Sequence, residues 1–392
     1  MADSDYDVLI AGAGPAGSHA AHLLARGGMR VALLDRARFP RDKVCGGGLS
    51  LKTLALLEPL PQSVVHRTLT GAWIAWRDRG AFAKDLGRPA GCMVVRREFD
   101  HWLLERAQAA GAHFHPETTV HAVTQGAHGV EIDTDRGAFR GRVLLAADGV
   151  GSTIREQVFG RRTVIYAPAV EALIPCSGER LERYGDRVLI DLGGMPRGYG
   201  WIFPKRDHLN AGVYSIFGGA GIRNHLQIFL RRHGLTADER TVRVCGHAIP
   251  VRNALRGYQR GSVWLLGDAA GLAEAVFGEG ICYALKSAEI AAGVLLETAD
   301  ASPAGEYERR VRRELEPELR WSRRVARLLY SIGPLAFDPL ARSRLGCEWF
   351  GALVTGELGY RECFWRAVAG VPAWLLSPRH ALQARSAWHP GP

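Results

Sequence analysis

The sequence predicts a mixed α/β fold, in which a Rossmann-like domain carries an inserted antiparallel β-sheet domain and is followed by a C-terminal helical segment. Three observations lead to this prediction. A glycine-rich strand–turn–helix pattern opens the chain, a largely β pattern covers residues 164–250, and helical periodicity runs beyond residue 298. We expect the helical segment to be broken at Pro334, Pro339 and Pro372, since proline removes a helical hydrogen bond.

The opening pattern is the sequence G-A-G-P-A-G at residues 12–17, which lies between apolar residues 8–11 and a helix-like stretch at 18–26. A second apolar strand at 31–34 follows and ends at Asp35. Glycines at this spacing between a strand and a helix, with an acid after the next strand, are typical of dinucleotide binding. The alternative is a glycine-rich turn with a purely structural role.

Each glycine of the pattern has a physical role. Gly12 makes the tight turn, Gly14 lets the backbone approach a pyrophosphate, and Gly17 lets the helix and strand pack closely. The N-terminal amides of the helix would then face the phosphate anion. Asp35 can accept hydrogen bonds from a ribose diol, which favours FAD or NAD over NADP.

The remaining elements follow from local patterns. We expect strands at 72–76, 81–86, 93–95, 119–124, 129–134, 142–146, 188–192, 199–203, 211–215 and 262–266, and helices at 98–110, 224–233 and 280–296. The Rossmann-like domain is therefore expected to be discontinuous. The predicted boundaries are 1–70, 91–160 and 251–300 for this domain, 71–90 and 161–250 for a β-rich substrate domain, and 301–392 for the helical region.

Composition narrows the class of protein. With 392 residues, 47% hydrophobic and 23% charged, the chain has the balance of a globular protein. The acidic N-terminus does not resemble a signal peptide, and no apolar run reaches the ~18–20 residues of a spanning helix. We therefore expect a cytoplasmic protein. The seven cysteines contain no C-x-x-C pair, which argues against a disulfide framework, a zinc site and an iron–sulfur cluster.

Basic and aromatic residues gather in the last quarter of the chain. Residues 301–392 hold 14 Arg and five of the ten Trp, and the net charge of the whole chain is +10. Arginine with tryptophan suits the anionic inner face of a membrane, where peripheral contact would occur. The alternative is a helical cap packed on the body of the protein. No nucleic-acid-binding motif accompanies the charge, so no nucleic-acid partner is expected.

Two further segments place acids at the ends of strands. An apolar strand ends in Asp148-Gly149, and another ends in Gly267-Asp268. Carboxylates at the carboxyl ends of strands in a doubly wound sheet can bind ribose or ribityl hydroxyls. Gly280 and Ile281 then open a helix whose free amides could face a flavin ring.

The order and spacing of these three signals resemble the p-hydroxybenzoate hydroxylase class of FAD enzymes over roughly residues 5–300. Two longer segments resemble one branch, the geranylgeranyl reductase family: the loop F-P-R-D-K-V-C-G-G-G-L-S at 39–50 and the segment G-Y-G-W-I-F-P-K at 198–205. Arg96 with Phe99 and Asp100 matches the R-x-x-F-D step of that family. The resemblance implies non-covalent FAD, held by Gly12, Gly14, Ala16, Gly17, Asp35, Arg36, Cys45, Gly46, Gly48, Arg96, Val120, Asp148, Gly267, Asp268, Gly280 and Ile281.

The family reduces carbon–carbon double bonds in polyprenyl groups, so the resemblance implies an isoprenoid lipid or prenylated quinone as substrate. The expected catalytic residues are Cys45, Tyr199 and Trp201, and the expected substrate-binding residues are Tyr199, Trp201, Phe203 and Lys205. Tyr199 and Trp201 are two apart on a predicted strand and share one face, as an aromatic wall for the substrate or as a core stripe.

Two of these residues, Cys45 and Lys205, have more than one interpretation. Cys45 could be a flavin neighbour, a proton donor or a small packing residue. Lys205 could neutralise a headgroup phosphate or be a solvated charge at the end of a strand.

The chain departs from the family pattern in two places. The family usually has proline before G-E-G-I, whereas Ala275 occupies that position here, which puts the stiffness of this backbone in question. The loop V-C-G-G-G-L-S at 44–50 also differs from the chlorophyll-type form, which argues against a pigment-tail substrate.

Two other classes of function stay open. An aromatic hydroxylase would use FAD with NAD(P)H and O2, and a membrane-associated flavoprotein could act only as an electron carrier. A halogenase is less favoured, because residues 199–204 read Y-G-W-I-F-P rather than W-x-W-x-I-P. Only one dinucleotide fingerprint is visible, so the electron donor could be NADPH or a ferredoxin.

Overall fold

The computed structural model of the chain describes residues 5–77, 81–127, 129–160, 164–235, 242–253, 257–297, 305–342, 348, 351–353 and 355–376. The chain forms two compact units. Unit 1 comprises Met1–Lys43, Arg96–Tyr166 and Ile249–Leu319, and unit 2 comprises Val44–Val95, Ala167–Ala248 and Arg320–Pro392. The predicted mixed α/β class is confirmed.

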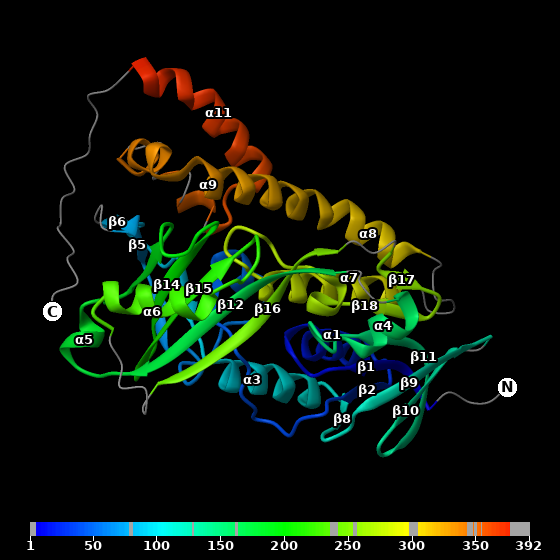
Figure 1. Cartoon of the computed structure of the whole chain (residues 1–392). Helices are drawn as coiled ribbons and strands as arrows, with labels where there is room; N and C mark the ends of the chain where they lie inside the picture. Colours follow the sequence, from blue (N-terminus) through cyan, green and yellow to red (C-terminus); the bar gives the residue numbers. More distant parts are fainter. Residues whose placement is uncertain are drawn as a thin grey trace. The chain divides into compact units, whose positions relative to one another are not determined.

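Unit 1 is built on an eight-stranded sheet whose central strands run parallel in the order β18-β11-β1-β2-β8 (Figure 1). The elements are β1 (Tyr6–Ala11), α1 (Pro15–Arg26), β2 (Val31–Leu34), α3 (Arg96–Ala109), β8 (His113–His115), β9 (Val120–Gly126), β10 (Gly129–Thr134), β11 (Gly137–Ala146), α4 (Thr153–Phe159), β17 (Gln259–Arg260), β18 (Val263–Leu265), the 3-10 helix η2 (Gly267–Ala270), α7 (Ile281–Glu297) and α8 (Glu306–Glu314).

The strand order explains where ligands can bind in unit 1. β1 lies between β2 and β11, so the chain reverses its direction of travel across the sheet at β1. Parallel strands end at a common edge, and ligands of such sheets bind outside that edge at the reversal. The segments after β1, β2, β11 and β18 therefore meet there.

Helix α1 forms because small and apolar residues recur along one side of residues 15–26. Ala16, Ala20, Ala21 and Leu24 are buried, and Pro15 stands at the start, where its missing N–H costs nothing. α1 packs against α7 and α3. This packing fixes the N-terminus of α1 at the carboxyl end of β1.

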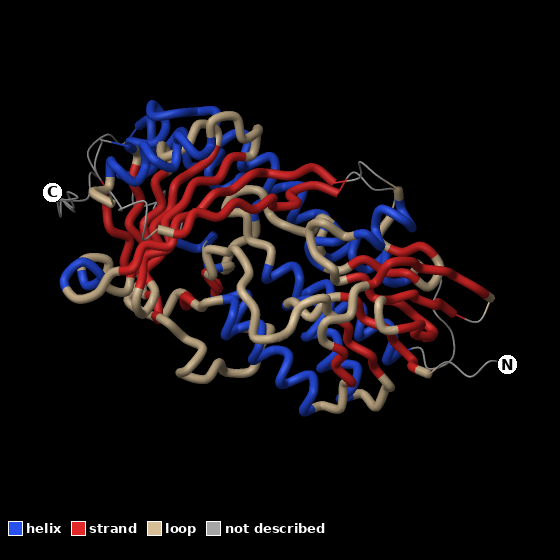
Figure 2. The backbone as a smooth tube through the Cα atoms, turned by 60° about the horizontal axis from the view of Figure 1, so that its bottom comes forward, coloured by secondary structure: helices blue, strands red, loops and turns tan. Residues whose placement is uncertain are grey.

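Unit 2 is built on a seven-stranded sheet in the order β16-β12-β15-β14-β13-β5-β6, which Figure 2 shows as long neighbouring strands. A small sheet, β3-β7-β4, accompanies it. The elements are β3 (Gly48–Ser50), α2 (Leu51–Leu54), β4 (Arg67–Leu69), β5 (Gly71–Ala75), β6 (Ala81–Asp85), β7 (Gly91–Met93), β12 (Val164–Pro175), α5 (Glu179–Glu182), β13 (Arg187–Asp191), β14 (Gly198–Pro204), β15 (His208–Ser215), α6 (Ile222–Arg232), β16 (Arg243–Asn253), α9 (Glu316–Arg342) and α11 (Tyr360–Leu376).

The large sheet has two different faces. On one face, Leu189 and Ile202 pack against Leu226 and Phe229 of α6 and form the core of the unit. Strands β12, β15, β14 and β13 pair antiparallel as expected, whereas β13 pairs with β5 in parallel register. The opposite face carries the side chains at 199, 201 and 203.

The C-terminal helices correct one expectation. Helix α9 runs through Pro334 and Pro339, and α11 runs through Pro372, so these prolines do not end the helices. A proline removes one backbone hydrogen bond, but the bonds on either side can carry a long helix past it. In the part of the chain that the structure describes, we find no helix whose length and hydropathy would let it span a bilayer.

Candidate cofactor and substrate sites

The glycine turn after β1 leaves no room for side chains at two of its positions. Gly12 has φ +101°, and a Cβ there would lie 2.3 Å from the carbonyl oxygen of Ala147. A Cβ on Gly17 would lie 1.8 Å from the carbonyl oxygen of Gly12. At Gly14 the nearest atom to such a Cβ is Nη2 of Arg41, 3.7 Å away. Two glycines therefore serve packing, and the third leaves the backbone open to a ligand.

The N-terminus of α1 is free to bind an anion. Gly14 is its N-cap residue and no side chain caps it. The first amides of an α-helix have no intrahelical acceptor, so they are available to a phosphate. The Asp35 carboxylate holds the turn in place, accepting hydrogen bonds from the amides of Ala13 (2.7 Å) and Ala37 (2.8 Å).

Two acids lie after β11 and β18, as the sequence predicts. The Oδ1 atom of Asp148 is buried without a hydrogen-bond partner among the described residues, and burial raises the pKa of this carboxyl. Burial also raises the pKa of Asp268, although the charges of Lys43, Arg96 and Arg155 oppose the effect. A buried carboxylate oxygen without a partner is costly, so a hydroxyl-bearing ligand would fit the site at Asp148.

Arg96 is fixed by its neighbour four residues on. Its Nε and Nη2 atoms donate to the two carboxylate oxygens of Asp100 at 2.7 and 2.8 Å, and Arg41 approaches the same carboxylate at 3.0 Å. This forked pairing holds the guanidinium in one orientation. The aspartate of the R-x-x-F-D step therefore positions the arginine.

Glu274 is a residue that the sequence reasoning missed. Its carboxylate accepts hydrogen bonds from the amides of Val276 (2.8 Å), Phe277 (2.6 Å) and Glu279 (3.1 Å). These bonds fix the backbone around Ala275, where the sequence lacks the proline of the family pattern. Glu274 precedes these three amides by two to five residues, and no sequence pattern specifies the turn that brings them to it.

The loop fixed by Glu274 leads to the start of α7. A Cβ on Gly280 would lie 3.1 Å from Oδ1 of Asp268, so these two predicted cofactor residues are close neighbours. Ile281 is the first residue of α7. Arg36 is exposed beside Asp35, and Val120 is the half-buried first residue of β9. The roles of all four in cofactor binding stay predictions.

Tyr199, Trp201 and Phe203 form one aromatic row on the face of the unit 2 sheet opposite α6. The ring centroids of Tyr199 and Trp201 are 5.8 Å apart, and those of Trp201 and Phe203 are 6.1 Å apart. The Tyr199 ring also lies 5.5 Å from the ring of Tyr214 in the next strand. Tyr199 and Trp201 are both 4% exposed. The expected sharing of one face is confirmed, and the use of that face as a substrate wall stays a prediction.

The strand register gives the aromatic row its neighbours. Trp201 pairs with Gly212, which pairs with Glu171, and Phe203 pairs with Asn210. A Cβ on Gly212 would lie 2.2 Å from the Trp201 ring, so the indole covers this glycine. The Trp201 Nε1 atom donates to Oδ1 of Asn210 at 2.7 Å. The indole is therefore fixed by both packing and a hydrogen bond.

The loop at 45–48 lies against this row. A Cβ on Gly46 would lie 2.9 Å from Cε2 of Phe203 and 3.6 Å from Nε1 of Trp201. Cys45 is half-buried, and its Sγ atom accepts a hydrogen bond from the amide of Gly47 at 3.4 Å. The structure thus brings together predicted residues from two distant segments of unit 2.

Lys205 is not a solvated charge, because it is only 1% exposed. Its Nζ atom donates to the carbonyl oxygens of Gly46 (2.6 Å), Gly47 (3.3 Å) and Val94 (3.0 Å), and lies 3.4 Å from Sδ of Met93. An ammonium has three protons, which these acceptors engage. The lysine is better placed to hold the loop than to meet a phosphate.

Comparison with known proteins identifies the family of the chain. Residues 5–165 match the family described as FAD binding domain. The chain is 32% identical to geranylgeranyl diphosphate reductase of Rhodobacter capsulatus over 71% of this chain and 72% of that one. It is 30% identical to digeranylgeranylglycerophospholipid reductase 1 of Methanopyrus kandleri, over 83% and 91% of the two chains.

Other relatives cover nearly the whole chain. Menaquinone reductase of Mycolicibacterium smegmatis is 29% identical over 95% of this chain and 97% of that one. A geranylgeranyl bacteriochlorophyll reductase-like structure from Thermoplasma acidophilum has a TM-score of 0.77 at 23% identity, covering 96% and 97%.

The uncapped helix N-terminus, the turn held by Asp35 and the unsatisfied oxygen of Asp148 fit FAD. The FAD-binding domain match and the relatives define an FAD-dependent oxidoreductase. Relatives at 30% identity or more cover most of the sequence. The chain belongs to the geranylgeranyl reductase family of FAD-dependent oxidoreductases.

Proposed function

We propose that this protein saturates carbon–carbon double bonds in the polyprenyl chain of a lipid or quinone. The observation that carries the proposal is the aromatic row Tyr199-Trp201-Phe203 with its glycine loop, on a sheet face distinct from the packed core. Relatives that act on geranylgeranyl groups and menaquinone support the substrate class.

In this proposal unit 1 holds the cofactor. The amides at the start of α1 bind the pyrophosphate, Asp35 binds a ribose hydroxyl, and Asp148 and Asp268 bind further hydroxyls. The amides of Gly280 and Ile281 at the start of α7 face the flavin ring. FAD, when bound, supplies the hydride, and the chain provides binding, orientation and electrostatics.

Unit 2 then holds the prenyl chain. Isolated alkenes are poor hydride acceptors, and positive charge develops on one carbon as the other is reduced. Aromatic faces of Tyr199 and Trp201 would position the alkene, exclude water and stabilise that charge. A proton must reach the charged carbon, and Cys45 beside the aromatic row is the proposed group to supply or guide it.

The test is an anaerobic turnover assay. The FAD-loaded protein is reduced with dithionite and mixed with geranylgeranyl diphosphate or a menaquinone, and products are analysed by mass spectrometry. We expect the mass of the prenyl chain to rise by multiples of two hydrogens, measured for menaquinone after the quinol ring has been reoxidised to the quinone. Product formation that requires O2 would instead identify a hydroxylase, and flavin oxidation without a changed lipid would identify an electron carrier.

Trp201→Ala sharpens this test. The variant removes the central ring of the row, so we expect normal FAD content and normal flavin reduction but at least about a tenfold loss of prenyl reduction. Phe217→Ala, an exposed aromatic elsewhere in unit 2, is the matched control. The same assay run with NADPH or with reduced ferredoxin identifies the electron donor, for which we propose one of these two.

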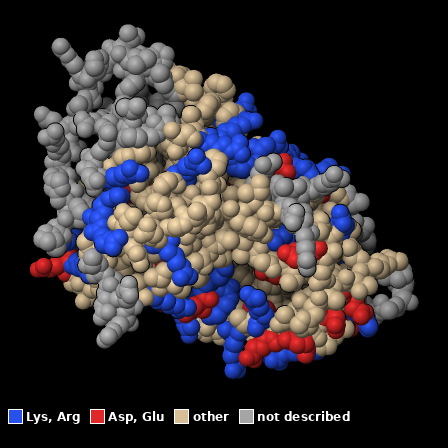
Figure 3. Space-filling view, viewed as in Figure 1, with Lys and Arg blue, Asp and Glu red and all other residues tan. Residues whose placement is uncertain are grey.

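We also propose peripheral contact with an anionic membrane through α9 and α11. Trp365 is 54% exposed, and the centroid of its ring lies 6.2 Å from the ring centroid of Trp321 in α9. Arg324 lies over the Trp321 ring at 4.7 Å. Figure 3 shows basic side chains gathered along the strip where Figure 1 places α9. Aromatic rings with arginines suit the headgroup region of a bilayer.

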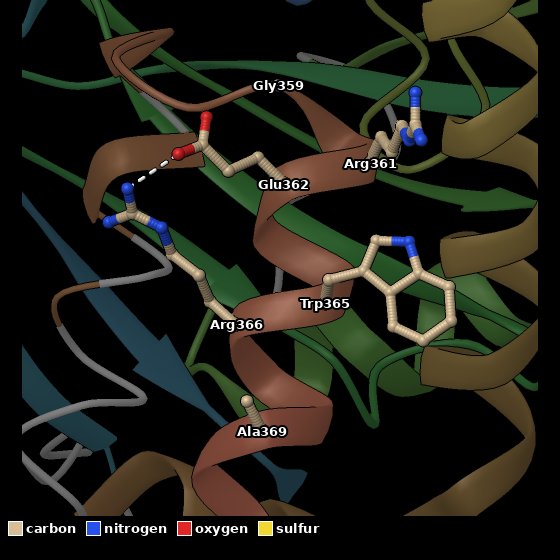
Figure 4. Close-up of a pocket in the computed structure, with 6 residues that line it drawn as sticks. All are labelled: Gly359, Arg361, Glu362, Trp365, Arg366 and Ala369. Carbon is tan, nitrogen blue, oxygen red and sulfur yellow. Dashed lines mark hydrogen bonds and ion pairs between the residues drawn. The ribbon is translucent and has the colours of Figure 1, made fainter.

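A pocket on α11 adds to this surface. It has a volume of about 500 Å³ and is lined by Gly359, Arg361, Glu362, Trp365, Arg366 and Ala369. Figure 4 shows the indole of Trp365 and the Glu362–Arg366 ion pair projecting from different sides of the helix. Trp349 and Trp388, which the sequence prediction also includes, lie outside the described residues.

Vesicle sedimentation tests the membrane proposal. We expect binding to vesicles containing phosphatidylglycerol, weaker binding at high salt, and a further loss in Trp365→Ala. Phe217→Ala serves again as the control. Equal binding of both variants would contradict a role for α11.

A further inference from the structure

The loop at 45–48 contacts two buried charged side chains of the neighbouring sheet. Glu171 is 5% exposed and Lys205 is 1% exposed. Neither is part of the G-x-G-x-x-G signal, and the sequence prediction does not include Glu171. Buried ions are costly unless they are paired and hydrogen-bonded, so the reason for this pair lies in what it contacts.

Glu171 holds the start of the loop. Its Oε1 atom accepts a hydrogen bond from the amide of Cys45 at 3.2 Å. Asn210 also hydrogen-bonds the Glu171 carboxyl, and its Nδ2 atom lies 3.5 Å from the carbonyl oxygen of Cys45. Because Asn210 accepts the Trp201 N–H, one chain of contacts joins the loop to the aromatic row.

Lys205 holds the next two residues. Its Nζ atom donates to the carbonyl oxygens of Gly46 at 2.6 Å and Gly47 at 3.3 Å, and to that of Val94 at 3.0 Å. The Glu171 carboxylate thus accepts a hydrogen bond from one N–H of the loop, and the Lys205 ammonium donates to two of its C=O groups. Burial lowers the pKa of Lys205 to about 8, and the charge of Glu171 opposes this shift.

The loop cannot hold itself in place by side-chain packing. Gly47 has φ +65°, and a Cβ there would lie 2.1 Å from the carbonyl oxygen of Val94. Gly46 lies against Phe203 with no space for a side chain. Three glycines in succession also give a chain with high conformational entropy when it is not held. Hydrogen bonds from outside the loop must therefore fix it.

We propose that Glu171 and Lys205 are positioning residues that hold the loop at 45–48 against Trp201 and Phe203, and so set the shape of the prenyl-binding wall. The substrate named here rests on the proposed function, whereas the contacts do not. Other titratable or charged groups act on this pair electrostatically: Cys45, Cys92 and Arg243.

Hydrogen exchange of the FAD-loaded protein tests the contacts directly. Glu171→Leu removes the acceptor of the Cys45 amide, so we expect protection of the amides at 45–48 to fall by about tenfold or more, the factor that a lost hydrogen bond to a charged group corresponds to. Glu171→Gln keeps an acceptor and should lose less. Glu182→Gln, at an exposed carboxylate of α5, should match the parent protein.

Labelling of Cys45 by N-ethylmaleimide gives a second readout on the same variants. We expect the rate to rise in the order parent, Glu171→Gln, Glu171→Leu, measured by peptide mass spectrometry. Unchanged labelling and unchanged exchange in Glu171→Leu would overturn the proposal.

Kinetics separate positioning from general support of the fold. In Glu171→Leu we expect FAD content and dithionite reduction as in the parent protein, with a loss of about tenfold in kcat for prenyl reduction. Glu171→Gln should restore much of this loss. A parent protein that reduces no prenyl substrate would defeat the proposed function, while the exchange result would still decide the positioning role.

The double variant Glu171→Leu/Lys205→Met covers the case in which an unpaired buried charge unfolds a single variant. Removing both charges together avoids that cost, so we expect a folded protein with a loosened loop. A folded double variant with parent-like protection at 45–48 would also overturn the proposal.

Discussion

The turn at 12–17 in unit 1 and the loop at 45–48 in unit 2 are both rich in glycine, but their backbone polar groups have different partners. At the first, no side chain caps the helix that follows, and its amides remain available to a ligand. At the second, Glu171 and Lys205 bind the amide and carbonyl groups of the loop. The first turn is arranged for an anionic ligand, and the second is completed by the protein itself.

This difference shows that glycine content alone does not identify a phosphate site. Glycine allows close approach in both places. In the turn it lets β1 and α1 lie close to each other, and in the loop it lets the backbone lie against aromatic rings. The partners of the backbone groups distinguish the two. Substitutions at each segment should therefore affect different measurements.

The largest effect is expected for Gly17→Ala. A Cβ there would meet the carbonyl oxygen of Gly12 at 1.8 Å, so β1 and α1 must separate. We expect a loss of stability of about 3 kcal/mol or more, and loss of bound FAD. Urea unfolding and the flavin absorbance of purified protein measure these effects. Gly126→Ala, where nothing lies within 4 Å of the added Cβ, should behave like the parent protein.

Lys205, which holds the loop at 45–48, should also make stability depend on pH. Because burial lowers the pKa of Lys205 from 10.5 to about 8, the unfolded chain binds more protons than the folded chain between these values. The stability of the parent protein relative to Lys205→Met should therefore rise with pH across this window, by up to about 3 kcal/mol. Urea unfolding at pH 7.5 and pH 10.5 measures the change, and a constant difference would contradict it.

Asp268→Ala should weaken the cofactor site without a large change in the fold. Loss of a carboxylate that binds a hydroxyl should lower FAD affinity by about tenfold to a hundredfold. Fluorescence titration of the apoprotein with FAD measures this, with the exposed Asp133→Ala of β10 as control. Equal affinities in the two variants would remove Asp268 from the proposed site.

The smallest effect is expected for Gly46→Ala. The added Cβ would lie 2.9 Å from the Phe203 ring, which must shift, at a cost of about 1 kcal/mol. We expect a smaller loss of bound FAD than in Gly17→Ala, because the fold of unit 1 is untouched, and a severalfold loss of prenyl reduction. Gly246→Ala, which makes only ordinary contacts, is the control in unit 2. A loss of flavin from Gly46→Ala as large as that from Gly17→Ala would break the distinction between the two segments.

The sequence was informative where function depends on the ends of strands. The turn after β1 and the acids Asp148 and Asp268 were predicted in place, because local patterns mark where a strand ends. The spacing of Tyr199 and Trp201 likewise predicted a shared face. Glu171 was missed because it lies within the apolar run A-V-E-A-L-I-P, and only the register of β12 and β15 places it beside Gly212.

Long-range pairing explains the other differences. Nothing local predicts that β5 pairs in parallel with β13, since the two strands are far apart in the sequence. The prolines of α9 and α11 were expected to end helices, but a long helix continues past them. Glu274 was missed because its three amide partners belong to a turn whose shape the sequence pattern does not specify.

The parallel pairing of β5 with β13 has a consequence for synthesis on the ribosome. Both units are assembled from three segments that alternate along the chain, so neither can close early. β5 emerges long before its partner and must wait with an unpaired edge, a state that favours aggregation. The nascent chain should therefore depend on chaperones at least until β13 (Arg187–Asp191) has left the exit tunnel.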